Sequence, residues 1–357
     1  MSRSSESLWS AVDAILDRLD PLDARAQGLG AMAARRLAAR SRPVPAVLAD
    51  EQRAAVMANL VAHGVLARVV SIAETPLIVF KGPEVAARYP GRARRYADLD
   101  LLVRDRGASD ALQAALLARG FELVPWEDDA PSEARHQHRL EWPGSGLPLE
   151  IHHALGFPTG VTPPAPELVF ESAVPSATGL DGLLAPAPTH HALLLTAHSW
   201  SDAPLRRLRD FVDVYASADG AADDDLERAA RAWGLDRVWR ATCARHDWLF
   251  GDARRPISTF VWGRQLAALR EPTVLEAHLE RWFAPFGALP PRHAAVTAWR
   301  RLASDARPDA KETWRGPPRR VLRAVLGART PLSRHVAEAR RRERDRLGPS
   351  GGLDSAP

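Results

Sequence analysis

The fold of this chain is constrained most by two aspartates, Asp98 and Asp100, that lie inside the apolar run ADLDLLV. The residues around them are typical of a buried β-strand. Because side chains alternate between the faces of a strand, both aspartates point the same way, about 7 Å apart, while Leu99 and Leu101 face a hydrophobic core. A buried carboxylate is costly unless a cation or hydrogen-bond donors compensate it. The run therefore predicts an arginine, backbone amides or a metal beside this strand.

A second run, LPLEIHH at residues 147–153, repeats this alternation. Its apolar residues fall on one face of a strand, and Glu150 and His152 fall on the other. If the two strands are neighbours, the carboxylates of Asp98, Asp100 and Glu150 converge. Carboxylates held together repel one another, and a hard divalent cation with oxygen ligands relieves the repulsion, so the pattern predicts Mg²⁺ or Mn²⁺. We expect His152 to orient a ligand through a hydrogen bond rather than to bind the metal itself.

A simpler interpretation of the aspartates needs no metal. A D-x-D pattern alone is weak, and the arginines at positions 92, 94 and 95 could neutralise Asp98 and Asp100 as ion pairs. Arg94 has two open interpretations, as a clamp on a nucleotide or as an ion-pair partner of Asp98. The order of the elements favours a site: a strand, a Lys-Gly turn, a helix, an arginine-rich loop, the D-x-D strand, and a later strand with a carboxylate.

Lys81 is one of only two lysines among 48 basic residues, and the other is Lys311. The abundance of arginine, alanine and proline indicates a GC-rich coding bias, so a retained lysine is informative. Lys81 follows an apolar strand predicted at 77–80 and precedes Gly82 and Pro83, where a helix can begin. A glycine at such a turn lets backbone amides approach a phosphate, and the lysine can reach phosphate oxygens as a point charge. The alternative is a lysine that extends from a strand end into water.

The chain as a whole is typical of an α+β protein. We divide it into an N-terminal helical segment at 1–74, a strand-rich segment at 75–155, a proline-rich surface linker at 156–188, a helical domain at 189–347 and a disordered tail at 348–357. The net charge is +4, and a single cysteine, Cys243, excludes an internal disulfide and a cysteine-based zinc site. No uninterrupted apolar run reaches about 18 residues, so we expect no spanning helix, no membrane partner and a cytoplasmic location.

The string VFKGPEVAARYPGRARRYADLDLLV, followed by ARGFELV and LEIHHALG, resembles the bacterial "uncharacterised nucleotidyltransferase" family of the DNA polymerase beta-like superfamily. The matching elements lie between residues 78 and 155: Lys-Gly, Tyr-Pro, an arginine four residues before D-x-D, Gly-Phe, and an acidic-x-His element. The resemblance implies a small mixed-sheet nucleotidyltransferase palm with N-terminal helices and a helical C-terminal domain. It also implies that Asp98 and Asp100 bind metal and that Glu150 is the third carboxylate.

The expected reaction is attack of an acceptor hydroxyl on the α-phosphate of an NTP, with release of pyrophosphate. The acceptor is a small molecule, a protein or an RNA. The expected catalytic and metal-binding residues are Asp98, Asp100 and Glu150 with Mg²⁺ (or Mn²⁺), and the expected nucleotide-binding residues are Lys81, Gly82 and Arg94.

Two other functions stay open. The superfamily commonly has Gly-Ser at the strand-helix turn, whereas Gly82 is followed here by Pro83, which favours a catalytically silent nucleotide-binding or scaffolding relative. The arginine run at 340–346 favours instead an RNA-directed transferase that acts as a toxin. Acidic residues interleave with that run and no aromatic residue punctuates it, so nucleic-acid binding is not favoured.

Four polar residues of the helical half have a role that the sequence leaves open. His191 and His198 lie seven residues apart on one predicted helix face, and Asp210 and Asp213 are three apart further along the chain. They could line the nucleotide pocket or form a buried, hydrogen-bonded cluster. We therefore keep them out of the predicted site.

Overall fold

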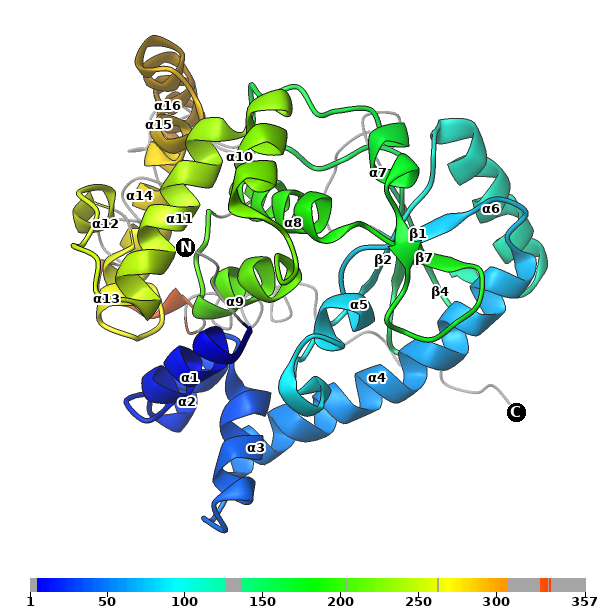
Figure 1. Ribbon diagram of the computed structural model, residues 1–357, viewed down its shortest axis with the longest axis horizontal. Coiled ribbons are helices and arrows are strands. Elements are labelled where there is room, and N and C mark those ends of the chain that lie inside the picture. Colours follow the sequence, from blue (N-terminus) through cyan, green and yellow to red (C-terminus); the bar gives the residue numbers. More distant parts are fainter. Residues whose placement is uncertain are drawn as a thin grey trace, which may run out of the picture. The chain divides into compact units, whose positions relative to one another are not determined.

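The computed structural model describes residues 5–125, 137–202, 204–261, 263–306, 328–332 and 334. The chain divides into two compact units, which we describe separately. The first comprises the chain up to residue 255 together with 287–289, and the second comprises the rest. All the predicted site residues belong to the first unit. Figure 1 shows its elements in colours that run from blue through cyan and green along the sequence.

A mixed sheet of seven described strands forms the centre of the first unit. The strands are β1 (Leu77–Val79), β2 (Leu99–Leu102), β3 (Glu122–Leu123), β4 (Gln137–Glu141), β5 (Leu149–His152), β6 (Val174–Pro175) and β7 (Leu183–Ala185). Their spatial order is β3-β4-β5-β2-β1-β7-β6. β2 runs parallel to β5, with Asp100 directly opposite Glu150. The two acidic strands are therefore neighbours, and their register sets two of the predicted carboxylates side by side.

The hydrophobic core lies between this sheet and two helices, α4 (Ala46–Ile72) and α6 (Arg106–Ala118). Leu99 and Leu101 of β2 point into this core and are fully buried. Truncation of either leucine to alanine would cost about 2–5 kcal/mol of stability. Because the apolar positions of β2 are used by the core, alternation along the strand leaves Asp100 on the other face.

Helix α4 is by length and composition able to cross a membrane, although the sequence has no uninterrupted apolar run of that length. Figure 1 shows it as one continuous rod, with α3 at its N-terminal end and the sheet at the other. Its residues Val65, Leu66 and Val69 belong to the core beneath the sheet. Packing against the sheet therefore accounts for the apolar character of this part of α4. The shorter helices α1 (Ser5–Leu16), α2 (Pro21–Ala26) and α3 (Gly30–Ala39) precede it.

Two helices from later in the chain, α8 (Pro188–Asp202) and α9 (Leu208–Ser217), approach the turn that follows β1. The next two helices, α10 (Asp223–Ala232) and α11 (Asp236–Phe250), pack against α8. His191 of α8 donates a hydrogen bond from Nε2 to the carbonyl oxygen of Phe80, at 2.7 Å. Helix α9 contacts α5 (Pro83–Ala86), the short helix that begins at Pro83 as predicted. The turn that carries Lys81 is thus enclosed by the helical part of the same unit.

Residues 156–188, predicted as a surface linker, differ from that expectation because they extend the sheet. They contain α7 (Glu167–Glu171), β6 and β7, and β7 pairs in parallel with β1. Leu183 and Ala185 of β7 are buried. The prolines that indicated a linker all lie outside β7. One of them, Pro175, lies in β6, which is an edge strand, and edge strands tolerate proline.

The division between units also differs from the predicted domain boundary. The sheet and helices α8–α11 form one unit, and the chain divides after residue 255 rather than at 188. The later helices are α12 (Ser258–Val261), α13 (Arg264–Ala267), α14 (Val274–Phe283), α15 (Pro285–Ala288) and α16 (Pro291–Ala306). The last part of the predicted helical domain, from residue 307 on, lies outside the described residues apart from 328–332 and 334, and so does the predicted tail at 348–357.

Candidate active site

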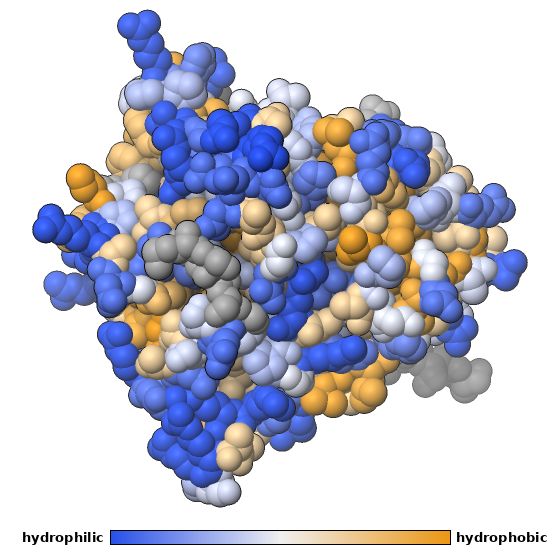
Figure 2. Space-filling view, in the orientation of Figure 1, coloured by the Kyte–Doolittle hydropathy of each residue, from blue (hydrophilic) through white to orange (hydrophobic). Residues whose placement is uncertain are grey.

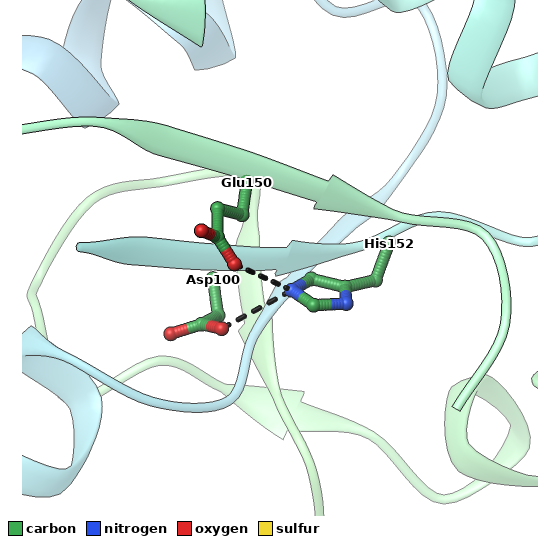
Figure 3. Close-up of side chains that lie close together, drawn as sticks. All are labelled: Asp100, Glu150 and His152. Carbon is green, nitrogen blue, oxygen red and sulfur yellow. Dashed lines mark hydrogen bonds and ion pairs between the residues drawn. The ribbon is translucent and has the colours of Figure 1, made fainter. Parts of the chain in front are cut away.

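Three side chains that can bind a metal gather where β2 and β5 lie side by side. Asp100 comes from β2, and Glu150 and His152 come from β5. One ligand atom of each lies within 4.8 Å of the others. Figure 3 shows both carboxylates turned toward the same nitrogen of the His152 ring. This Nε2 atom lies 3.1 Å from Asp100 Oδ1 and 3.7 Å from Glu150 Oε2.

Asp100 is the most deeply buried carboxylate of this group, with 1% of its surface exposed. Its Oδ1 accepts hydrogen bonds from Lys81 Nζ, at 3.0 Å, and from His152 Nε2. Burial alone would raise the pKa of Asp100, but the Lys81 ammonium and the His152 hydrogen bond hold that pKa well below its usual value. The other oxygen, Oδ2, is buried and has no hydrogen-bond partner among the described residues. A buried anionic oxygen of this kind is a place where a cation would bind.

Glu150 is held from the neighbouring strand β4. Its Oε2 accepts a hydrogen bond from Gln137 Nε2, at 3.0 Å, and its Oε1 lies 3.6 Å from Arg139 Nε. Burial, together with the charges of Asp100 and Asp98, raises the pKa of Glu150 to about 7. Repulsion between the carboxylates is thus only partly relieved by the protein, and a divalent cation would relieve it further.

Asp98 comes one residue before β2 and is half-buried. It forms no hydrogen bond or ion pair with any residue that the structure describes. Burial and the nearby charge of Asp100 raise the pKa of Asp98. The structure therefore brings Asp100 and Glu150 together and places Asp98 beside them, outside the group whose ligand atoms lie within 4.8 Å of one another.

Lys81 is not a surface lysine, because its side chain is only 13% exposed. Its ammonium donates to Asp100 and also to Nε2 of His198 in α8, at 2.9 Å. The next residue, Gly82, has a φ of +53°, and a Cβ there would lie 2.9 Å from the carbonyl oxygen of Asp98. The close approach of this turn to the strand therefore requires glycine by itself, whatever binds beside it.

Arg94 is buried in the loop before β2 and is bound to Asp213 of α9. Two of its guanidinium nitrogens donate to the two carboxylate oxygens of Asp213, both at 2.7 Å. Tyr89 adds a hydrogen bond from its hydroxyl to Asp213 Oδ1, at 2.6 Å. Arg94 forms no ion pair with Asp98, so neither of the two interpretations drawn from the sequence included its actual partner. The pair joins the arginine-rich loop to the helical part of the unit.

A cavity of about 370 Å³ adjoins these residues, a size typical of small-molecule sites. The sheet side contributes Lys81, Gly82, Arg94 and Asp98, and the helical side contributes His198, Asp210, Asp213 and the arginines at 206, 207 and 209. Figure 2 shows hydrophilic residues gathered on the face between α9 and α5. The cavity therefore carries many charges of both signs, with cationic side chains in excess.

Sequence reasoning left several of these residues outside the predicted site. His198 contacts Lys81, and Asp213 holds Arg94. The available signal was a polar residue within an apolar helical run, LLLTAHSW and DFVDVY. The arginines at 206, 207 and 209 carried no usable signal, because arginine is abundant along the whole chain. The expected hydrogen bond of His152 is present, although the ring also belongs to the group that could hold a metal.

The structure has carboxylates on two adjacent strands of a mixed sheet, with a lysine-glycine turn and a polar cavity beside them. This arrangement agrees with the nucleotidyltransferase palm that the resemblance of the sequence implied. A family model described as "uncharacterised nucleotidyltransferase" matches residues 23–251. The chain therefore belongs to the uncharacterised nucleotidyltransferase family, which confirms the resemblance. The family supports nucleotidyl transfer as the general chemistry and a nucleotide as the substrate. No curated protein matches the chain at a significant level.

Proposed function

We propose that this protein transfers a nucleoside monophosphate from an NTP to a hydroxyl acceptor, releases pyrophosphate, and depends on Mg²⁺ or Mn²⁺. The observation that carries the proposal is Asp100, whose Oδ2 is buried and has no hydrogen-bond partner among the described residues. One of the two carboxylate oxygens of Asp100 lies within 4.8 Å of a ligand atom of Glu150. Carboxylate repulsion that the protein relieves only in part, beside a cavity of this size, favours metal-assisted transfer to or from a phosphate. Membership of the family supports the same general chemistry.

The residues fit a hard divalent cation. Asp98, Asp100 and Glu150 offer carboxylate oxygens, which are the ligands that Mg²⁺ and Mn²⁺ prefer. Burial lowers the pKa of His152, and its Nε2–H group donates to Asp100, so a neutral ring that orients this carboxylate is the role we assign to it. When bound, the cation supplies polarisation of the α-phosphate and a lower pKa for the acceptor hydroxyl.

The chain's own residues bind and orient the nucleotide in this proposal. Lys81 exchanges its contact with Asp100 for a phosphate oxygen and stabilises the charge that develops on the leaving pyrophosphate. Gly82 keeps the cavity wall beside Asp98 free of a side chain. Arg94 remains bound to Asp213 and positions the loop that leads into β2.

The proposal is tested by incubating the protein with each of the four NTPs, labelled at the α-phosphate or at the γ-phosphate. Each reaction contains Mg²⁺ or Mn²⁺ and a cell extract that supplies acceptors, whether small molecules, proteins or RNA. We expect an acceptor labelled from the α-phosphate only, and no label with Asp100→Asn. Label that arrives from the γ-phosphate would contradict nucleotidyl transfer, because it would indicate phosphoryl transfer instead.

A second candidate is nucleotide binding without transfer. The ion pair between Lys81 and Asp100 favours it, because a protein cation already compensates the carboxylate that would hold the metal. Thermal stabilisation by NTP that is equal with and without Mg²⁺ would support this candidate, whereas stabilisation that requires Mg²⁺ would support transfer.

The toxin alternative depends on residues 340–346, which lie outside the described residues. The single cysteine, Cys243, supports a cytoplasmic location as part of the proposal.

A further inference from the structure

The geometry points to the arginines at 206, 207 and 209 as the residues that bind the polyphosphate of the nucleotide, from the side of the cavity opposite the Lys-Gly turn. This inference rests on the proposed function, since it assigns the phosphate-binding wall of the same site. All three arginines line the cavity, together with Lys81 and Arg94. A triphosphate carries three to four negative charges, and guanidinium groups match phosphate oxygens in a planar, bidentate geometry.

The charge of the cavity wall favours an anion of this size. Arg94 forms a bidentate pair with Asp213, so these two residues leave little net charge, and the third guanidinium nitrogen of Arg94, Nη1, is buried with no hydrogen-bond partner among the described residues. Arg209 is held less firmly, since its nitrogens lie 3.8 Å from Asp210 and 3.9 Å from Asp213. Its Nε is buried and has no hydrogen-bond partner among the described residues. The helical wall therefore offers guanidinium groups in excess of its carboxylates.

The loop before α9 is shaped to present these arginines. Leu205 has a φ of +48°, a left-handed conformation that costs a residue with a side chain about 1 kcal/mol or more. Its side chain is fully buried, and its amide donates to the hydroxyl of Ser199, at 2.9 Å. Leu205 is thus held in this conformation by its buried side chain and by its amide hydrogen bond. The next two residues along the chain are Arg206 and Arg207, which line the cavity.

The backbone amides at the start of α9 are already hydrogen-bonded, so an anion there would be bound by side chains. The amides of Leu208 and Arg209 donate to the side chain and the carbonyl oxygen of Gln27, at 2.9 and 3.2 Å. The amide of Arg207 donates to Asp210, at 3.0 Å. An anion at this helix terminus would therefore find no open amide at these three positions, in contrast to the usual helix N-terminal site. The guanidinium groups are left as the binding groups.

This assignment also accounts for the unusual turn after β1. Pro83 provides neither a hydroxyl nor an amide hydrogen, and Gly82 is required by its approach to Asp98 rather than by a ligand. The turn is therefore a poor polyphosphate cradle apart from Lys81. The arginines across the cavity supply the contacts that the turn lacks.

The test uses inorganic tripolyphosphate, a probe that needs neither a base nor a catalytic metal. Titration calorimetry on the full chain in the presence of a chelator measures its binding against that of orthophosphate. We expect the parent protein to prefer tripolyphosphate, and the double variant Arg206→Gln/Arg207→Gln to bind it at least tenfold more weakly. Arg209→Gln should lose affinity as well. The control is Arg228→Gln on α10, an exposed arginine outside the cavity, which should bind within twofold of the parent.

The outcomes separate this inference from the proposed function. If the parent binds tripolyphosphate through these arginines but transfers no nucleotide, the inference stands and the proposed function fails. If the parent transfers nucleotides and the variants bind NTP and tripolyphosphate as tightly as it does, the function stands and the inference is wrong. A parent that does not bind tripolyphosphate also overturns the inference. Arg207→Gln alone, at an exposed position, provides the same comparison if the double variant does not fold.

Discussion

Arg94 and Asp213 form a buried, bidentate ion pair across 119 residues of sequence, with two N–O distances of 2.7 Å. The pair joins the loop that leads into the D-x-D strand to helix α9. It therefore fixes the position of the helical wall of the cavity relative to the sheet within the first unit. Together with the hydrogen bond from the Tyr89 hydroxyl to Asp213, the pair ties the loop before the strand with the carboxylates to the helix that begins beside the arginines.

We predict that Asp213→Asn destabilises the protein by about 3–5 kcal/mol, because it leaves the Arg94 guanidinium buried without its charge partner. Urea unfolding measures the effect. Asp210→Asn on the same helix is the matched control and should cost at most about 1 kcal/mol, since the asparagine side-chain oxygen can still accept the backbone hydrogen bond that Arg207 donates at the first turn. The double variant Arg94→Met/Asp213→Leu should be more stable than Asp213→Asn. Equal stability of the two single variants would contradict a structural role for the pair.

A second prediction concerns Lys81, which compensates Asp100 in the absence of metal. Lys81→Met keeps the length of the side chain but removes its charge, so the metal-free protein should lose about 3 kcal/mol of stability. Mg²⁺ should restore part of the loss, because it supplies positive charge beside the same carboxylate. Lys81→Arg should cost less stability than Lys81→Met, because it keeps the charge, and it should still impair NTP binding. Thermal melts with a chelator or with Mg²⁺ measure both effects, and unchanged melting of Lys81→Met would contradict the ion pair.

The third prediction follows from the raised pKa of Glu150, about 7 in the folded protein against about 4.5 in the unfolded chain. A carboxyl whose folded pKa is raised binds more protons when folded, so stability falls as pH rises from about 4.5 to about 7. The loss from Glu150 alone would be about 3 kcal/mol in the metal-free protein. Comparison of the unfolding free energy of the parent and Glu150→Gln at each pH measures it. The unfolding free energy of the variant should increase relative to that of the parent as pH rises. A difference in unfolding free energy that does not change with pH would contradict the prediction.

His191 should produce the opposite slope. Burial lowers the pKa of His191 to about 3, and its Nε2 donates to the carbonyl oxygen of Phe80. Its contribution to stability is present above the unfolded pKa of about 6.5 and is lost, by about 1.4 kcal/mol per pH unit, as pH falls toward 3. His191→Gln keeps a donor without this titration, so the parent should lose stability relative to the variant below pH 6.5. A parallel pH dependence of the two proteins would rule out this linkage.

These two slopes overlap between about pH 4.5 and 6.5 and partly cancel there. The pH profile of the parent protein alone is therefore uninformative in this range, and each contribution is measured only as a difference from its own variant. Above pH 6.5, Glu150 is the one of these two residues that still makes stability depend on pH.

The elements nearest the site were predictable because their signals are local. The alternation around Asp98 and Asp100, and again around Glu150, follows directly from the pleat of a strand, and the neighbouring strands have the assumed pairing. The partner of Arg94 was not predictable, because many aspartates and glutamates are closer in sequence than Asp213 and nothing local distinguishes it. The place of β7 in the sheet was missed because three residues among many prolines give no periodic pattern.

The two neighbours of β1 have a consequence for how the chain can be shortened. β1 pairs with β2 on one side and, more than a hundred residues later in the sequence, with β7 on the other. A fragment that ends at residue 155 would contain every predicted catalytic carboxylate, yet the backbone of β1 on the β7 side would be an open edge. Open edges of apolar strands recruit further chains and aggregate. Because β7 (Leu183–Ala185) closes this edge, the smallest fragment that keeps β1 as an interior strand extends at least to the end of β7.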